Sequence, residues 1–481
     1  MRKILAGIKI QHVAAAGIIL LLVIGNAAPV DDPDVWWHLR VGQDIWAQGE
    51  IPVKDAYSFS NAGHTWVAHE WLAEVFYGQV YATSGYQGLL VFNITVISLT
   101  LFLLYKVIMD YLGERKAAAL AMLIVAAVLN SVFWMFRPHI PAYLLFASFI
   151  FLLYREKKFR KGICLLPFLM ILWVNIHGSY ILGIWLAGIY LLSGTVRLEI
   201  GRMVPRLMDR DRKKTTVAVL AAIILAVFVN PNTYHMFLYP FQTVNSEMIT
   251  SNVLEWLSPD FHQKRMALFL AYIMFTYGIL AISRERIYID EMVNMLAFTA
   301  LAMFGARNLA LYVFISLPVM ARHLKGLLGQ PVKRVNMPFV NWAAVLLTVV
   351  LTVVFWPSAR SLEDNTGKGE FPQAALRYME EHSLKGNIFN DYDWGGYLIW
   401  KGYPDFRVFV DGRADIYADR VIPDYITIMS AGKESYRVFE SYNTDYALLR
   451  RDEPFAALLS ASPGWSGIYR DETAVIFARV R

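Results

Sequence analysis

Long apolar runs dominate this chain and limit what it can fold into. About eleven segments each approach the roughly 20 residues that a helix needs to cross a bilayer. These segments are 11–30, 86–108, 117–135, 139–154, 162–177, 179–196, 215–230, 265–283, 287–305, 309–322 and 338–357. Of the 481 residues, 57% are hydrophobic and 17% are charged, whereas a soluble domain normally carries about 25% charge. We therefore expect a polytopic α-helical membrane protein.

The first apolar run and the single cysteine each have two interpretations. The run resembles the apolar region of a signal peptide, but its length and the many later spans favour a retained first helix. Cys164 is the only cysteine, so an internal disulfide, a thiolate metal site and a redox pair are excluded. We interpret it as a free structural thiol.

Basic residues in the short loops indicate the orientation of the chain. They concentrate in alternate loops, for example at 115–116, 155–161 and 197–214, and are isolated in the others. The positive-inside rule makes the basic loops cytoplasmic. With an odd number of spans in the plasma (inner) membrane, residues 358–481 are then extracytoplasmic. The net charge of +6 serves topology and lipid headgroups rather than nucleic acid, and 197–214 is predicted to form a surface amphipathic helix.

The loop between the first two predicted spans, residues 31–85, concentrates chemically active side chains. It carries Asp32, Asp34, His38, His69 and Glu70. A carboxylate in such a loop can act as a general base towards a hydroxyl or an amine. Alternatively, Asp32, Asp34 and His38 hold a divalent metal ion such as Mg²⁺ or Mn²⁺. In a structural interpretation, Asp32 caps a helix starting near Val35, and Asp34 complements its dipole.

Other junctions on the same predicted side are also polar. Arg137 and His139 follow the third span, His177 follows the fifth and Arg307 follows the ninth. Guanidinium and imidazole groups can bind a phosphate, and arginine can do so in a bidentate manner. An arginine at a helix end is more often a headgroup anchor. Four such residues at junctions that a bundle brings together favour a binding site for the phosphate of a lipid donor.

After residue 357 the composition changes to alternating strand and helix patterns, which predict a small α/β domain over 358–481. Five polar residues follow predicted strands, where α/β folds place ligand sites. They are Asp391, Asp393, Asp411, Arg413 and Asp415. Turn formation and a local ion pair are the structural alternatives. We therefore divide the chain into a membrane domain, 1–357, and an extracytoplasmic domain, 358–481.

Four segments together resemble a known group of proteins. They are Asp32–Leu39, His69–Leu72, Asn390–Tyr397 and Phe409–Asp415. The segments look like those of uncharacterised bacterial members of the GT-C glycosyltransferase superfamily. The chain is similar more distantly to protein mannosyltransferases and lipid A aminoarabinose transferases. The resemblance implies sugar transfer from a polyprenyl-phosphate donor on the outer face. It maps the catalytic acidic residue of the first outer loop onto Asp34, with Asp32 as the competing choice.

These observations predict an inverting, polyprenyl-phosphate-dependent glycosyltransferase with Asp34 as base. Asp32, His38 and Glu70 support Asp34 or hold a metal. The tail carboxylates contact a glycan, lipid or protein acceptor. The alternatives are a lipid-linked sugar transporter and a non-catalytic envelope assembly or sensing protein. Transport is disfavoured because the span interiors hold almost no ionisable residues, and Asp290 and Glu291 lie near the inner end of their helix.

Overall fold

The computed structural model describes residues 9–329, 337–367, 369–417 and 420–480. It divides into two compact units. The first comprises Met1–Ala28, Leu90–Thr233 and Leu254–Ser358, and the second comprises Pro29–Leu89, Tyr234–Val253 and Ala359–Arg481. The prediction that the N-terminus is cytoplasmic concerns residues 1–8, which lie outside the described residues.

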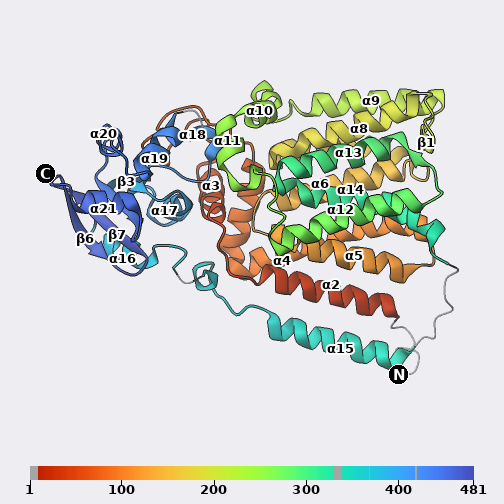
Figure 1. Cartoon of the computed structure of the whole chain (residues 1–481), viewed down its shortest axis with the longest axis horizontal. Helices are drawn as coiled ribbons and strands as arrows, with labels where there is room; N and C mark the ends of the chain where they lie inside the picture. Colours follow the sequence, from red (N-terminus) through yellow and green to blue (C-terminus); the bar gives the residue numbers. More distant parts are fainter. Residues whose placement is uncertain (1–8, 330–336, 368, 418–419, 481) are drawn as a thin grey trace. The chain divides into compact units, whose positions relative to one another are not determined.

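The first unit is a bundle of helices that lie side by side (Figure 1). A helix coincides with each apolar run predicted from the sequence. These helices are α2 (Ile10–Asn26), the later part of α4 (Trp71–Leu112), α5 (Lys116–Asn130), α6 (His139–Tyr154), α7 (Leu166–Ile176), α8 (Ile181–Thr195), α9 (Arg210–Ala226), α12 (Lys264–Ile282), α13 (Ile289–Phe304), α14 (Leu309–Leu327) and α15 (Pro338–Phe355).

Length and apolar composition support membrane insertion for part of this set. In the described residues, 5 helices are long and apolar enough to cross a membrane. They are Trp71–Leu112, Lys116–Phe133, Gly178–Thr195, Lys264–Ile282 and Pro338–Phe355. Two shorter apolar helices, Gln11–Asn26 and His139–Tyr154, accompany them. These helices are consistent with a multi-pass membrane protein. The number of spans and their orientation stay predictions.

The amphipathic helix predicted over 197–214 is wrong for most of its length. The strand β1 (Met203–Val204) pairs in parallel with β2 (Ile287–Tyr288), and α9 begins only at Arg210. Arg206 is buried beside Asp290, at 3.1 Å between Nε and Oδ2. Because buried carboxylates require a cation close by, the segment carrying Arg206 is drawn inward rather than along a surface.

The second unit contains the first loop, residues 31–85, together with the tail from Ala359 onward. In the first loop, α3 (Asp34–Gln48) and the beginning of α4 are helical, and α3 begins next to Val35, where a helix was expected. The 42-residue helix α4 is interrupted at Gly85 (φ 59°, ψ −154°), a conformation that favours glycine, just before the predicted span at 86–108. Two further helices, α10 (Tyr234–Asn245) and α11 (Glu247–Asn252), belong to this unit.

The tail contains a mixed sheet flanked by helices, so strands and helices do alternate there as the sequence predicted. Its five strands have the order β4-β3-β5-β7-β6, in which β4, β3 and β5 are parallel and the last two pair antiparallel. The strands are β3 (Gly386–Asn390), β4 (Phe406–Val408), β5 (Tyr446–Arg450), β6 (Trp465–Arg470) and β7 (Ala474–Arg479). The strand β6 was not predicted from the sequence. The surrounding helices are α16 (Gln373–Glu381), α17 (Gly395–Gly402), α18 (Ala414–Tyr417), α19 (Val421–Met429), α20 (Ser435–Glu440) and α21 (Pro454–Ser460).

The first loop contributes to the tail's fold. Phe59 packs against the tail's apolar core, which includes Phe389 and Phe409. Its backbone N–H donates to the carbonyl of Val408 in β4 at 3.0 Å. The contacts therefore group the first loop with the tail, while the domain boundary at residue 357 stays a prediction.

Candidate functional site

Asp34 is the first residue of α3, and its neighbours fix its side chain. Its backbone N–H donates to Oδ1 of Asp32 at 3.1 Å, and Nε1 of Trp37 donates to Oδ1 of Asp34 at 3.1 Å. Pro33 suits the start of a helix, where no N–H is needed. Asp34 lies in the first turn of α3, as the structural interpretation expected, whereas the N-cap residue is Pro33 rather than Asp32. The contacts with Asp32 and Trp37 orient the Asp34 carboxylate.

Glycines of the tail fit against this helix start. A Cβ atom on Gly412 would lie 1.6 Å from Oδ1 of Asp34, and one on Gly396 would lie 2.3 Å from the carbonyl oxygen of Pro33. Real Cβ atoms do not approach other atoms so closely. Asn390–Tyr397 and Phe409–Asp415, two of the segments that carried the resemblance, thus pack against the start of α3 around Asp34.

A buried ion cluster joins the same two regions. Arg413 is 2% exposed, and its guanidinium donates to Asp411 at 2.6 Å and to Asp55 at 2.9 Å. Burial lowers the pKa of Arg413, but Asp411 and Asp55 more than offset this and hold it well above its usual value. The ring of Trp66 lies 4.8 Å from the guanidinium carbon, a cation–π distance. The predicted acceptor contacts of Asp411 and Arg413 stay predictions, whereas their contacts with the first loop are observed.

A second polar group lies where the parallel strands β3 and β5 end. Asp391 follows β3 and accepts from Nε of Arg450, the last residue of β5, at 2.9 Å. Asp393 lies 3.3 Å from the same guanidinium, and its side chain is 58% exposed. Asp391 and Asp393 thus meet Arg450 where β3 and β5 end, and their predicted contact with an acceptor stays a prediction. Of this group, Asp393 offers the most surface for an acceptor.

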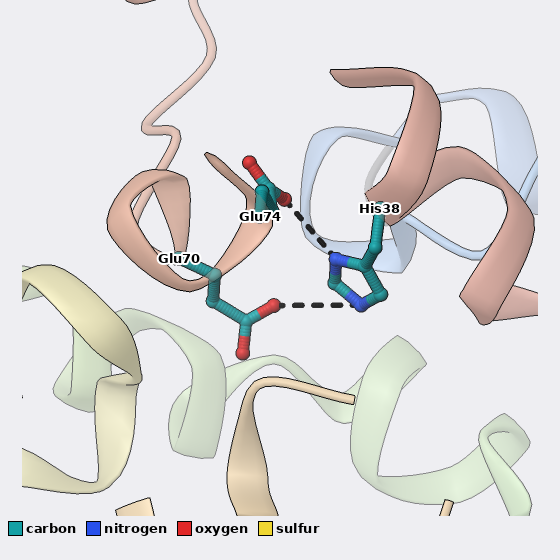
Figure 2. A group of neighbouring side chains, drawn as sticks. All are labelled: His38, Glu70 and Glu74. Carbon is teal, nitrogen blue, oxygen red and sulfur yellow. Dashed lines mark hydrogen bonds and ion pairs between the residues drawn. The ribbon is translucent and has the colours of Figure 1, made fainter. Parts of the chain in front are cut away.

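His38, Glu70 and Glu74 form a buried cluster in the first loop (Figure 2). Glu74 Oε1 lies 3.1 Å from Nδ1 of His38, and Glu70 Oε2 lies 3.8 Å from Nε2. One ligand atom from each residue lies within 4.8 Å of the others. The structure thus places His38 with Glu70 and Glu74, and the metal site predicted from Asp32, Asp34 and His38 is not tested. Glu74 was missed, although its four-residue spacing from Glu70 places both on one helix face.

Close contact between α3 and α4 fixes this cluster. A Cβ atom on Gly42 would lie 1.9 Å from the carbonyl oxygen of Glu74, and one on Gly78 would lie 2.9 Å from the backbone nitrogen of Gln43. The backbones of α3 and α4 are therefore in contact beside the cluster. This contact fixes the position of His38 opposite Glu74.

His69 extends the polar region of the second unit towards the tail. Its ring stacks on Tyr239 of α10, with 4.1 Å between ring centroids, and Nε2 lies 3.2 Å from the tyrosine hydroxyl. Tyr239 also hydrogen-bonds Asp415. Burial is the main reason that the pKa of Asp415 is raised to about 6. No local pattern connects these residues, which are far apart along the chain.

In the first unit, two of the predicted phosphate-binding arginines surround a carboxylate. Arg137 donates to Glu255 at 2.6 Å, and Arg307 lies 3.9 Å from its other oxygen. Glu255 belongs to the turn η4 (Leu254–Trp256), outside the predicted spans. Arg137, followed by Arg307, lowers the pKa of Glu255 to about 2 despite burial. Two permanent positive charges against one negative charge leave a net positive charge.

A cavity of about 250 Å³ opens at this group. It is lined by three of the four predicted phosphate-binding residues, His139, His177 and Arg307, together with Glu255. His139 and His177 each interact with a protein oxygen, at 2.7 Å from the carbonyl of Phe133 and 2.8 Å from the hydroxyl of Ser179 respectively. Most of the other lining side chains are apolar, and Ser179 and Asn308 add polar groups. A small anion with an apolar attachment suits such a cavity.

No family model and no curated protein matches the sequence. Similarity to solved structures, in contrast, extends over most of the chain. The oligosaccharyltransferase of Archaeoglobus fulgidus in its apo form has a TM-score of 0.56 at 11% identity, over 92% of this chain and 69% of that one. ArnT from Cupriavidus metallidurans bound to undecaprenyl phosphate has a TM-score of 0.53 at 13% identity, over 98% of each chain.

A third similar structure is the mycobacterial arabinofuranosyltransferase AftD. Its TM-score is 0.53 at 13% identity, and the match covers 99% of this chain and 41% of AftD. All three are GT-C glycosyltransferases that use lipid-linked sugars. The fold of this chain is therefore similar to the GT-C fold, as the sequence resemblance predicted.

Proposed function

We propose that this protein is a glycosyltransferase that moves a sugar from a polyprenyl-phosphate donor to an acceptor on the outer face of the plasma membrane. The observation that carries the proposal is the cavity containing Arg307, His139 and His177, in a fold similar to proteins with lipid-linked donors. The ArnT structure contains undecaprenyl phosphate, and another structure of the archaeal enzyme contains a dolichol-phosphate. The acceptor is a glycan, a lipid or a protein.

In the proposed reaction, Asp34 is the general base. Its carboxylate takes the proton of an acceptor hydroxyl or amine as the acceptor oxygen or nitrogen bonds to the anomeric carbon. The bond from that carbon to the donor phosphate breaks, and the phosphate leaves with its electron pair. Attack opposite the leaving group inverts the anomeric configuration. The fixed contacts with Asp32 and Trp37 support this role because they orient the carboxylate before the acceptor binds.

Arg307 and Arg137 are proposed to stabilise the leaving phosphate. Binding the phosphate equally throughout gives no acceleration, so their contribution depends on the charge that grows as the bond breaks. Glu255 holds both guanidinium groups in place and leaves one positive charge for the phosphate. His139 and His177 supply further hydrogen-bonding groups at the cavity.

The first test is donor turnover by purified protein in lipid. A panel of radiolabelled polyprenyl-phosphate sugars and a cell-envelope extract are supplied to the wild type, Asp34→Asn and the control Asp31→Asn. Asp31 is exposed and lies three residues before Asp34. Its substitution therefore removes one nearby negative charge, as Asp34→Asn does. We expect transfer or slow donor hydrolysis that disappears in Asp34→Asn and persists in Asp31→Asn.

Each alternative outcome has a defined meaning. Turnover that persists in Asp34→Asn would still support a glycosyltransferase, but the general base would then be Asp32 or Glu70. Binding of the lipids by folded protein without turnover of any donor would refute the transferase proposal. A transporter or an envelope assembly protein would then be favoured.

A further inference from the structure

The buried cluster of His38, Glu70 and Glu74 takes all three of its side chains from the first loop. It is built from α3, the turn before α4 and the first turn of α4. His38 and Glu74 are 3% and 1% exposed, and the side chain of Glu70 is 12% exposed. Glu70 is therefore the member that solvent reaches.

The two contacts of the His38 ring differ in length. The 3.1 Å from Nδ1 to Glu74 Oε1 is a hydrogen-bond distance. The 3.8 Å from Nε2 to Glu70 Oε2 is too long for a hydrogen bond. Two atoms bound to one ion at about 2.1 Å each lie at most about 4.2 Å apart. The longer separation therefore suits two ligands of the same ion.

A positive charge bound at this cluster would stabilise Glu74. Its Oε2 atom is buried and makes no hydrogen bond with any residue that the structure describes. A buried carboxylate with an unsatisfied oxygen is costly unless it is compensated. A neutral imidazole offsets little of that charge, whereas an imidazole bound to a cation is polarised and compensates it more fully.

We infer that His38 and Glu70 bind a divalent transition-metal ion, with Nε2 and a carboxylate oxygen as ligands and Glu74 holding the ring through Nδ1. A carboxylate behind a metal-binding imidazole is a common arrangement that fixes the tautomer and the orientation of the ring. The mixed nitrogen and oxygen ligands favour Zn²⁺ or Mn²⁺ over Ca²⁺. The inference depends on these residues and not on the proposed transfer reaction.

The position of the site suggests its use. His38 lies four residues after Asp34 on α3, so the two side chains share a helix face. Two protein ligands leave several positions of the ion for oxygen atoms of a bound molecule, as in sites that recognise phosphates. The ligand class for the open positions is therefore a phosphate or a sugar hydroxyl.

The test is metal binding by the full chain in nanodiscs of zwitterionic lipid after treatment with EDTA. Bound Mn²⁺ is measured from the loss of the free-ion electron paramagnetic resonance signal, and Zn²⁺ and excess Ca²⁺ are added as competitors. We expect one Mn²⁺ per chain that Zn²⁺ displaces and Ca²⁺ does not. Thermal unfolding of the same samples should show stabilisation by Zn²⁺.

The variants give a graded pattern. His38→Ala and Glu70→Gln should abolish binding, whereas Glu74→Gln should weaken it about 10- to 100-fold because the ring loses its charged partner. Glu50→Gln, an exposed carboxylate that follows α3, is the matched control and should bind like the wild type. Circular dichroism of metal-free samples checks that each variant is folded, and His38→Gln replaces His38→Ala if the latter is not.

Wild-type protein that binds no more Mn²⁺ than His38→Ala would overturn the inference, and the cluster would then share a proton. Binding that persists in both His38→Ala and Glu70→Gln would also overturn it, because the ion would lie elsewhere. Neither result depends on finding a donor or an acceptor.

Discussion

Replacing Gly412 with alanine tests whether the tail positions the proposed base. The added Cβ atom would lie 1.6 Å from Oδ1 and 2.7 Å from Cγ of Asp34. Asp34 is anchored at the start of α3 and held by Trp37, so it has little freedom to move away. Overpacking a tight site costs roughly 1–3 kcal/mol, and the rigid backbone on both sides favours the upper end.

A double-mutant cycle separates this clash from a general loss of packing. Asp34→Ala removes the two nearest atoms that the new Cβ meets and leaves Nε1 of Trp37 at 3.2 Å, so Gly412→Ala should cost much less in that background. The expected coupling is about 2 kcal/mol or more, well above the few tenths found for independent sites. Asp34→Ala alone should lose about 1 kcal/mol with the Trp37 hydrogen bond.

Thermal unfolding in nanodiscs measures the effect, with donor turnover as a second readout. A loss of about 3 kcal/mol corresponds to roughly 6–10 °C in Tm for a unit of this size. Gly467→Ala is the control, because its Cβ would meet nothing closer than 3.8 Å. Additive effects of Gly412→Ala and Asp34→Ala, or equal effects of Gly412→Ala and Gly467→Ala, would refute the proposed contact.

Three further predictions follow from the charges. Asp55→Asn should cost about 3–5 kcal/mol, because it removes a partner of buried Arg413, and Tm and limited proteolysis of the tail should both show this. Asp415 has a raised pKa of about 6, so its carboxyl stays protonated to a higher pH in the folded state than in the unfolded state. Stability should therefore fall by up to about 3 kcal/mol as pH rises from about 4 to about 6, and stay level above; Asp415→Asn should abolish that slope in unfolding scans. Glu255→Gln should tighten binding of undecaprenyl phosphate at least about threefold in equilibrium titrations, since Arg137 and Arg307 lose their counter-charge; unchanged or weaker binding would contradict a phosphate role for the pair.

The helices were the most predictable part of the fold. Apolar runs near bilayer length coincide with helices from α2 to α15, and period and strand patterns located four of the five strands in the tail. The strand β6 was missed because its residues, Trp465 to Arg470, alternate weakly and only Trp465 is buried. The segment 197–209 was misassigned because basic and apolar residues suggested a surface helix, whereas long-range pairing with Asp290 decided its conformation.

The candidate site was only partly predictable for the same reason. Asp34, Arg307 and His139 stand out locally, as polar residues at helix ends beside apolar runs. Glu255 gave no such signal, since its significance arises from two arginines that are distant in sequence. Gly412 looked like an ordinary turn residue, and its close approach to Asp34 exists only after the tail has folded.

The contacts between the first loop and the tail also have a consequence for biosynthesis. The ribosome completes the first loop when hundreds of residues, including those around Gly412 and Arg413, are still to be made. The loop's buried Asp55 has no guanidinium partner until those residues emerge, so its native arrangement must form late. A nascent or truncated chain would then hold an immature first loop, and any chemistry that depends on it would begin only after synthesis of the whole polypeptide.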